Sequence, residues 1–135
     1  MKNKLIASLL ALSCLNAIIG TTSVEASPLK PGELGFTRAM VAGKTMSSSG
    51  YPNGTITFNT NGSMTCSNYP AFVTCKSWRI DLNGKLQREF TDAHTGAATE
   101  VIAHWKLLSN NGATLQVSQT SNNSTGETTL TVTYR

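Results

Sequence analysis

The chain has 135 residues, only 13% of which are charged, and its formal net charge is +4. The eleven Lys and Arg residues are scattered, without a run that could follow a phosphate backbone, so the charge pattern argues against a nucleic-acid-binding protein. The length is that of one folded domain behind an N-terminal leader.

Residues 1–26 are typical of a secretory signal peptide. Lysines at positions 2 and 4 precede a mostly apolar stretch over 5–20, and compact residues at 24 and 26 occupy the positions that a signal peptidase reads. We predict cleavage after Ala26, export to the periplasm or the extracellular space, and no stable membrane span afterwards. Cys14 follows a small residue, as in a lipoprotein signal, but apolar residues continue beyond it. We therefore expect Cys14 to be removed with the signal peptide.

After the signal peptide, residues 27–35 carry two prolines and no periodicity, which predicts an extended N-terminal arm. Residues 36–135 then predict a single β-barrel domain. The chain after position 26 keeps nine Lys or Arg (eleven less Lys2 and Lys4) and six Asp or Glu (seven less Glu25), a net charge of about +3.

Eight strands and no helix are predicted, because apolar and polar residues alternate between turn signals. Three of the turns contain Asn-Gly, which favours tight hairpins. The longest connection is expected over 43–54. The predicted strands cover residues 36–41, 55–60, 63–67, 72–82, 85–91, 99–108, 113–120 and 127–134.

Alternation assigns one apolar and one polar face to successive strands, as in an antiparallel meander. A sheet of this size must cover its apolar face, and short hairpins favour up-and-down closure over a Greek key. The fold prediction is therefore all-β, a meander of about eight strands closing into a barrel or a curled half-barrel, with an open sandwich as the alternative. The expected inward residues are Ile56, Phe58, Met64, Cys66, Phe72, Trp78, Ile80, Leu82, Leu86, Arg88, Phe90, Val101, Ala103, Trp105, Leu107, Leu115, Val117, Leu130, Val132 and Tyr134.

Two cysteines, Cys66 and Cys75, remain after the signal peptide and flank a turn that contains Pro70. An even cysteine count in an exported chain predicts a structural disulfide. A reactive or metal-binding pair is the alternative, although the spacing is not Cys-x-x-Cys and no histidine is near in sequence.

The segment from Gly43 to Arg135, with "GTITF", "NGS" and "SWRIDLNGKL", resembles small exported bacterial proteins of the lipocalin-like (calycin) type. The sequence "GFT" at 35–37 stands where true lipocalins carry Gly-x-Trp. The resemblance implies a β-barrel and transfers no ligand-binding residues.

Enzyme signals are weak. Asp92 and His94 form an Asp-x-His pair in a predicted turn, and His104 is expected on the outer face. Such a pair could bind a metal or transfer protons, but no third ligand accompanies it. No nucleophile elbow or glycine-rich phosphate loop is present. We expect neither an enzyme nor a cofactor or metal site.

The inward face suggests a binding protein instead, since an eight-stranded barrel can hold one small ligand. Arg88 would need a partner there, such as a ligand carboxylate, unless its head reaches water at the rim. We predict a noncatalytic monomer that binds a small apolar or amphipathic ligand. The alternative is a secreted or periplasmic inhibitor, or another protein-interaction module, that uses the N-terminal arm and the 43–54 loop. The predicted ligand-binding residues are Trp78, Arg88, Phe90, Trp105 and Tyr134.

Overall fold

The computed structural model describes Leu29 and residues 31–135. The predicted signal peptide over 1–26, with Cys14, lies outside the described residues. Within the described part of the chain, no helix is long and apolar enough to cross a membrane.

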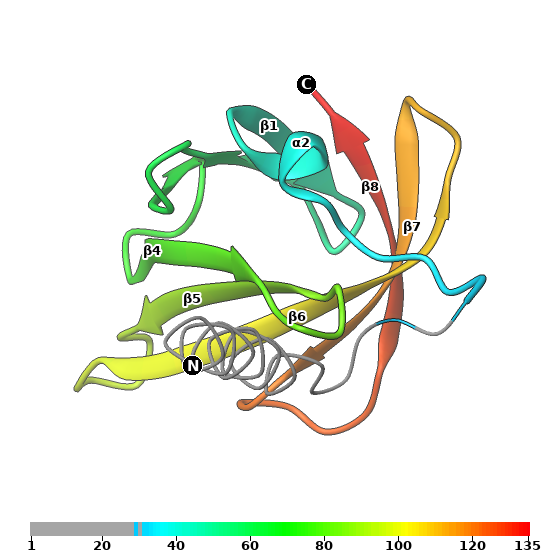
Figure 1. The fold of residues 1–135 in the computed structure, drawn as a ribbon. Coiled ribbons are helices and arrows are strands. Elements are labelled where there is room, and N and C mark those ends of the chain that lie inside the picture. The colour runs from blue at the N-terminus through cyan, green and yellow to red at the C-terminus, as the bar shows by residue number, and fades with distance from the viewer. Residues whose placement is uncertain (1–28, 30) are drawn as a thin grey trace, which may run out of the picture.

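Eight antiparallel strands form one sheet that curls into a nearly closed barrel (Figure 1). The order β3-β2-β1-β8-β7-β6-β5-β4 is that of an up-and-down meander, in which the first and last strands also pair. The predicted fold class is confirmed. The strands are β1 (Lys44–Ser48), β2 (Tyr51–Phe58), β3 (Met64–Ser67), β4 (Val73–Ile80), β5 (Leu86–Asp92), β6 (Thr99–Asn110), β7 (Thr114–Ser121) and β8 (Thr128–Tyr134).

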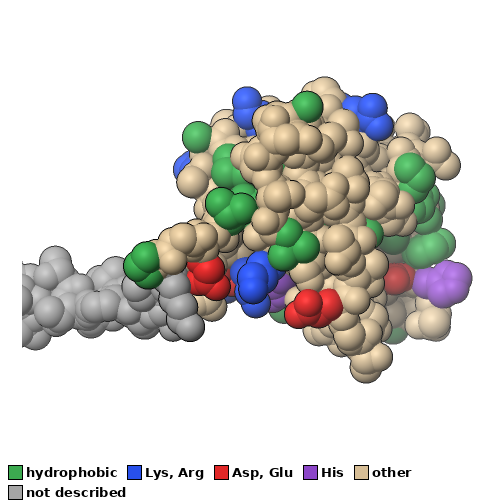
Figure 2. Space-filling model, turned by 90° about the vertical axis from the view of Figure 1, so that its right-hand side faces the viewer, with side chains coloured by type: hydrophobic (Ala, Val, Ile, Leu, Met, Phe, Trp, Pro, Cys, Tyr) green, Lys and Arg blue, Asp and Glu red, His purple; other side chains and the backbone are tan. Residues whose placement is uncertain are grey.

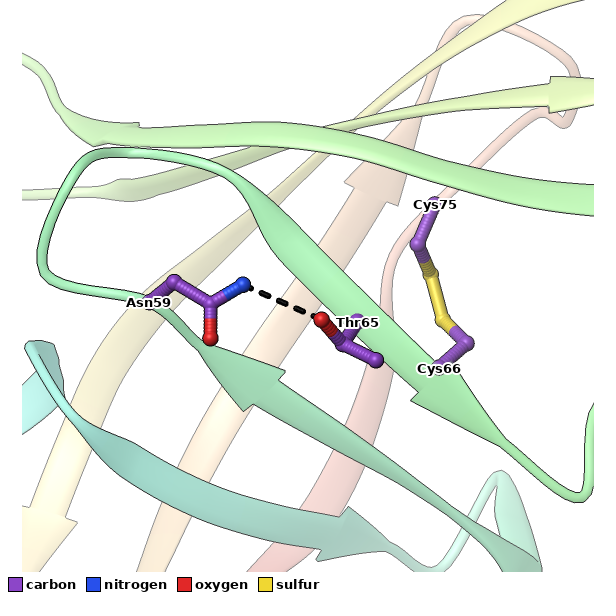
Figure 3. Close-up of a disulfide and its surroundings, with 4 residues drawn as sticks. All are labelled: Asn59, Thr65, Cys66 and Cys75. Atoms are coloured by element: carbon purple, nitrogen blue, oxygen red, sulfur yellow. Dashed lines mark hydrogen bonds between the residues drawn. A yellow bond between two sulfur atoms is a disulfide. The ribbon is translucent and has the colours of Figure 1, made fainter.

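The barrel closes incompletely between β3 and β4, a line that we call the seam. Only an isolated bridge between Ser63 and Ser77 pairs these two edges in the described chain. The predicted disulfide between Cys66 and Cys75 crosses the seam, with the two Cα atoms 5.8 Å apart (Figure 3). The bond indicates an oxidising compartment.

The predicted strand over 36–41 is wrong. Arg38–Val41 form a short helix, α2, which lies at the end of the barrel where the C-terminus emerges (Figure 1). The turn of helix allows both Phe36 and Val41 to be buried in the core, and the backbone N–H of Phe36 donates to the carbonyl of Gly84 at 2.8 Å. Residues 36–42 therefore plug one end of the barrel.

The predicted 43–54 loop is also wrong, because it contains β1 and the first part of β2. Met46 is the one large apolar side chain that β1 places in the core, where it is 1% exposed. The strand forms because it pairs with β2 on one side and β8 on the other. The polar sequence of β1 gives little indication that it forms a strand.

The predicted inward face is largely confirmed, and Phe58 packs between Trp78 and Trp105 at centroid distances of 6.0 and 6.4 Å. Two members are wrong. A bulge between Cys75 and Ser77 reverses the alternation of β4, so Phe72 lies 39% exposed on the outside, and Leu82 in the following turn is 63% exposed.

The outer surface is mostly polar and uncharged. Figure 2 shows one face of the molecule, on which the Lys and Arg side chains lie apart and form no continuous positive band.

Candidate ligand-binding site

A pocket of about 240 Å³ opens at the end of the barrel opposite α2. Hairpin connections form its rim, because the strand alternation brings several turns of a meander to the same end. The β1–β2 hairpin supplies Gly50 and Tyr51, the β3–β4 connection supplies Tyr69, and the β7–β8 turn supplies Asn123. The pocket is thus an end opening of the barrel.

Arg88 lines this pocket from β5, between Leu86 and Phe90 on the same inward face. It is only 4% exposed, so its head does not reach water at a rim. Its Nη2 atom donates to Oε1 of Gln119 at 2.8 Å, while Nε is buried without a hydrogen-bond partner. The guanidinium carbon lies 3.8 Å from the ring centroid of Trp105 and 5.5 Å from that of Phe90.

Arg88 is charged but unpaired. Burial lowers the pKa of Arg88 to about 9, with a smaller opposing effect from Tyr69, so the guanidinium is still largely protonated at neutral pH. No carboxylate of the described residues forms an ion pair with it, since the one ion pair found there joins Lys76 and Glu100 on the surface. Neutral dipoles and aromatic faces are therefore its compensation.

Two stacked tyrosines form one side of the pocket. The ring centroids of Tyr51 and Tyr69 lie 4.6 Å apart with the planes tilted by 33°. Both rings rest against the backbone of Gly54, where an added Cβ atom would lie 2.6 Å from a ring carbon of each. Burial raises the pKa of Tyr69, so its hydroxyl stays protonated at neutral pH.

A second pocket, of about 460 Å³, lies at the end of the barrel that α2 plugs. Lys44, Tyr134 and Arg135 line it together with the backbone of the plug. The Tyr134 hydroxyl donates to the carbonyl of Met40 at 3.0 Å, and burial raises the pKa of Tyr134. Its lining is more polar than that of the first pocket and includes no buried cation.

The structure brings together three of the five predicted ligand-binding residues. Arg88 and Phe90 line the end pocket, and Trp105 lies directly against the guanidinium, with its Nε1 donating to Gln119 Oε1 at 2.8 Å. Trp78 does not line this pocket, and its Nε1 donates to the carbonyl of Asn59. Tyr134 lines the pocket at the opposite end.

Sequence reasoning missed Tyr51, Tyr69 and Gln119. Gln119 carried a usable signal, because it continues the inward series of Leu115 and Val117 on β7 and is a polar residue on an apolar face. Tyr69 carried none, since its position depends on how the β3–β4 connection folds over the barrel end.

The histidines lie elsewhere. The ring of His94 packs on Phe72 outside the barrel at a centroid distance of 4.8 Å, and its backbone N–H donates to Asp92 Oδ1. His104 faces outward beside Gln87, and burial lowers its pKa. Among the described residues, no group of three His, Cys, Asp or Glu side chains is arranged to hold a metal ion.

The barrel architecture, with eight antiparallel strands in meander order, is consistent with a lipocalin-like fold. Comparisons with models of protein families, with curated proteins and with solved structures found no match.

Proposed function

We propose that this protein is an exported, noncatalytic binding protein that holds a small apolar or amphipathic ligand in the pocket opposite α2. The observation that carries the proposal is the pocket itself, since it joins aromatic walls to a buried guanidinium at one end of the barrel, a combination that the pocket at the α2 end lacks. A concave site with apolar walls and a few converging polar groups is the usual form of a small-molecule site.

The volume of the pocket restricts the ligand to a compact molecule. An apolar cavity of about 150 Å³ accommodates benzene, and drug-sized ligands occupy about 300–1,000 Å³. The end pocket, at about 240 Å³, lies between these sizes. A ligand with one ring or a short chain fits it, whereas a long lipid would extend beyond the rim.

The lining suits a molecule with an apolar body and a polar head. Tyr51, Phe90 and Leu130 offer apolar surface, whereas Gln119 and Asn123 offer hydrogen-bonding groups. Aromatic side chains bury a large area and tolerate several ligand shapes. The apolar body of a ligand would pack against the first group of side chains, and its polar head would form hydrogen bonds with the second. Both kinds of contact would favour binding.

Recognition of a protein through the arm and residues 43–54 has less support. The strands of this stretch are paired within the barrel, and Phe36 is buried in the plug that follows the arm. Residues 44–54 are thus held largely in the barrel wall, whereas residues 31–34 of the arm stay exposed.

The test is native mass spectrometry of protein purified gently from its own exported fraction. A discrete extra mass that disappears on unfolding is the expected result. Val101→Trp would fill the pocket from β6 and should abolish the extra mass, whereas Leu108→Trp, on the exposed outer surface of the same strand, should retain it. The two variants insert the same side chain and leave the net charge unchanged.

A second measurement tests binding in case the natural ligand is lost during purification. Thermal shifts with neutral, anionic and cationic one-ring compounds should show stabilisation by at least one class in the wild type and in Leu108→Trp. An apo mass combined with no shift from any class would contradict the proposed function. Equal shifts in Val101→Trp and Leu108→Trp would place the binding outside this pocket.

A further inference from the structure

We propose that the ligand is a compact monocarboxylate and that its carboxylate group pairs with the guanidinium of Arg88. This inference rests on the proposed function and specifies the ligand class for the same pocket.

The first reason is charge. Among the described residues, Arg88 is the single ionic side chain that lines the pocket, and it is 4% exposed. A buried charge without an opposite charge is costly, and an anion bound in the pocket would supply that charge where the protein does not. Burial also lowers the pKa of Arg88, because the charged form of the side chain is less stable away from water.

The second reason is hydrogen bonding. A guanidinium carries five N–H donors, yet Arg88 forms one side-chain hydrogen bond, to Gln119, and its Nε atom is left unpartnered. Trp105 donates to the same oxygen of Gln119, so this amide is already shared between two donors. The planar fork of arginine matches a carboxylate, which can accept two parallel bonds.

The third reason concerns the number of charges. A dianion would bring two negative charges to a pocket whose described lining offers one cation, and the second charge would be desolvated without compensation. A cationic head group would be repelled by Arg88. A single carboxylate on a compact apolar body satisfies the charge, the donors and the aromatic walls together.

The test compares two ligands of nearly equal shape by isothermal titration calorimetry at neutral pH and low salt. The probes are 3-phenylpropanoate and its neutral analogue 3-phenylpropanamide. The wild type should bind the acid at least tenfold more tightly than the amide. Arg88→Met should lose this preference, whereas Arg79→Met, which removes the same charge from the exposed face of β4, should keep it.

Each outcome decides a different claim. If the wild type binds the amide as tightly as the acid, or if Arg88→Met keeps the preference, the pairing with Arg88 is wrong and the binding function stands. If neither probe binds and the neutral and cationic one-ring compounds also fail, the proposed function is wrong and this inference falls with it. The wild-type comparison requires no variant, so a folding defect in Arg88→Met cannot obscure the result.

Discussion

Arg88 is surrounded by side chains that offer it dipoles and aromatic faces but no negative charge. Gln119, Trp105 and Phe90 are all neutral, and Nε has no partner. A core that served stability alone would place an apolar residue at this position, because its two neighbours on the same face are apolar. We therefore expect Arg88 to lower the stability of the free protein, a cost that the proposed anion would offset.

We expect Arg88→Met to raise the free energy of unfolding by about 1–3 kcal/mol in the absence of ligand. Methionine has a similar reach, and Gln119 Oε1 keeps its bond from Trp105, so the change leaves no new unpaired acceptor. Urea unfolding followed by fluorescence measures the difference. Arg79→Met serves as the control and should be close to the wild type. A loss of stability in Arg88→Met would instead identify Arg88 as a structural residue.

The advantage of Arg88→Met should shrink as pH rises above about 9. The folded wild type releases the Arg88 proton near a pKa of about 9, whereas the unfolded chain, in which Arg88 is hydrated, holds this proton to a much higher pH. Between these values the unfolded wild type binds more protons, so the contribution of Arg88 to stability rises with pH. Burial raises the pKa of Tyr134 in both proteins, so this effect cancels in the difference. Burial also raises the pKa of Tyr69, and Arg88 partly opposes this rise; without Arg88 the variant loses more stability when tyrosine ionises, which adds to the convergence. Urea unfolding at pH 7, 9 and 10.5 should reveal the convergence, and a constant difference would contradict it.

The residues of the site were only partly predictable. Alternation along β5 and β6 correctly placed Arg88, Phe90 and Trp105 on the inward face, because both strands are paired on two sides and regular there. Tyr69 could not be found in this way, since it lies in a connection without periodicity. Its contact with Tyr51 lies beyond the β2–β3 ladder, which ends at the pair Thr55 and Ser67, and so depends on the path of this connection.

At the scale of elements, the seam is the weakest line of the barrel wall. β3 has four residues, and the disulfide ties it to β4 near the Tyr69 connection that borders the pocket. The Asn59 side chain donates to Thr65 Oγ1 at 3.0 Å across the β2–β3 turn and so steadies β3 from its other side (Figure 3). Covalent closure substitutes here for a continuous hydrogen-bonded ladder.

Removing the disulfide with the double substitution Cys66→Ala/Cys75→Ala should lower the free energy of unfolding by roughly 2.5–3 kcal/mol. The estimate is the loop entropy that a ring of this size returns to the unfolded chain. Urea unfolding measures the loss, and mass spectrometry of the wild type under nonreducing conditions should find no free thiol at either position. Free thiols would refute the bond, and unchanged stability would show that the seam holds without it.

Two elements escaped sequence analysis for opposite reasons. The segment around α2 alternates enough to resemble a strand, but it pairs with no strand of the sheet and turns inward as a plug. The segment of β1 has almost no apolar signal, yet it has two strands beside it. In both segments the structure depends on which strands lie beside the segment in the folded barrel. A local sequence pattern does not contain this information.

At the scale of the whole molecule, the two ends of the barrel have different tasks. The plug fills one end with Phe36 and Val41, and the ring of hairpin turns at the other end borders the pocket. If the end pocket binds a ligand as proposed, substitutions in these turns should change its specificity while the packed middle and the plug preserve stability.

Amide hydrogen exchange should follow this layout. We expect the slowest exchange in the middle of β6, which has twelve residues and is paired along both edges, and the fastest strand exchange in β3. Mass spectrometry of peptides after exchange in mild denaturant resolves the two regions. Protection of β3 equal to that of β6 would mean that the seam is as firm as the rest of the wall.

The pairing of β1 with β8 has a consequence for biosynthesis. Every other ladder joins strands that follow one another in sequence. Met46, by contrast, pairs with Tyr134, which lies at the other end of the domain's sequence. Closing so long a loop is slow, and β1 is the first strand to be synthesised, so one of its edges stays open until the last strand is available. Exposed apolar edges recruit other chains. We therefore expect the polar sequence of β1, with Lys44 at its start and Met46 as its one large apolar residue, to protect the unfinished chain from aggregation.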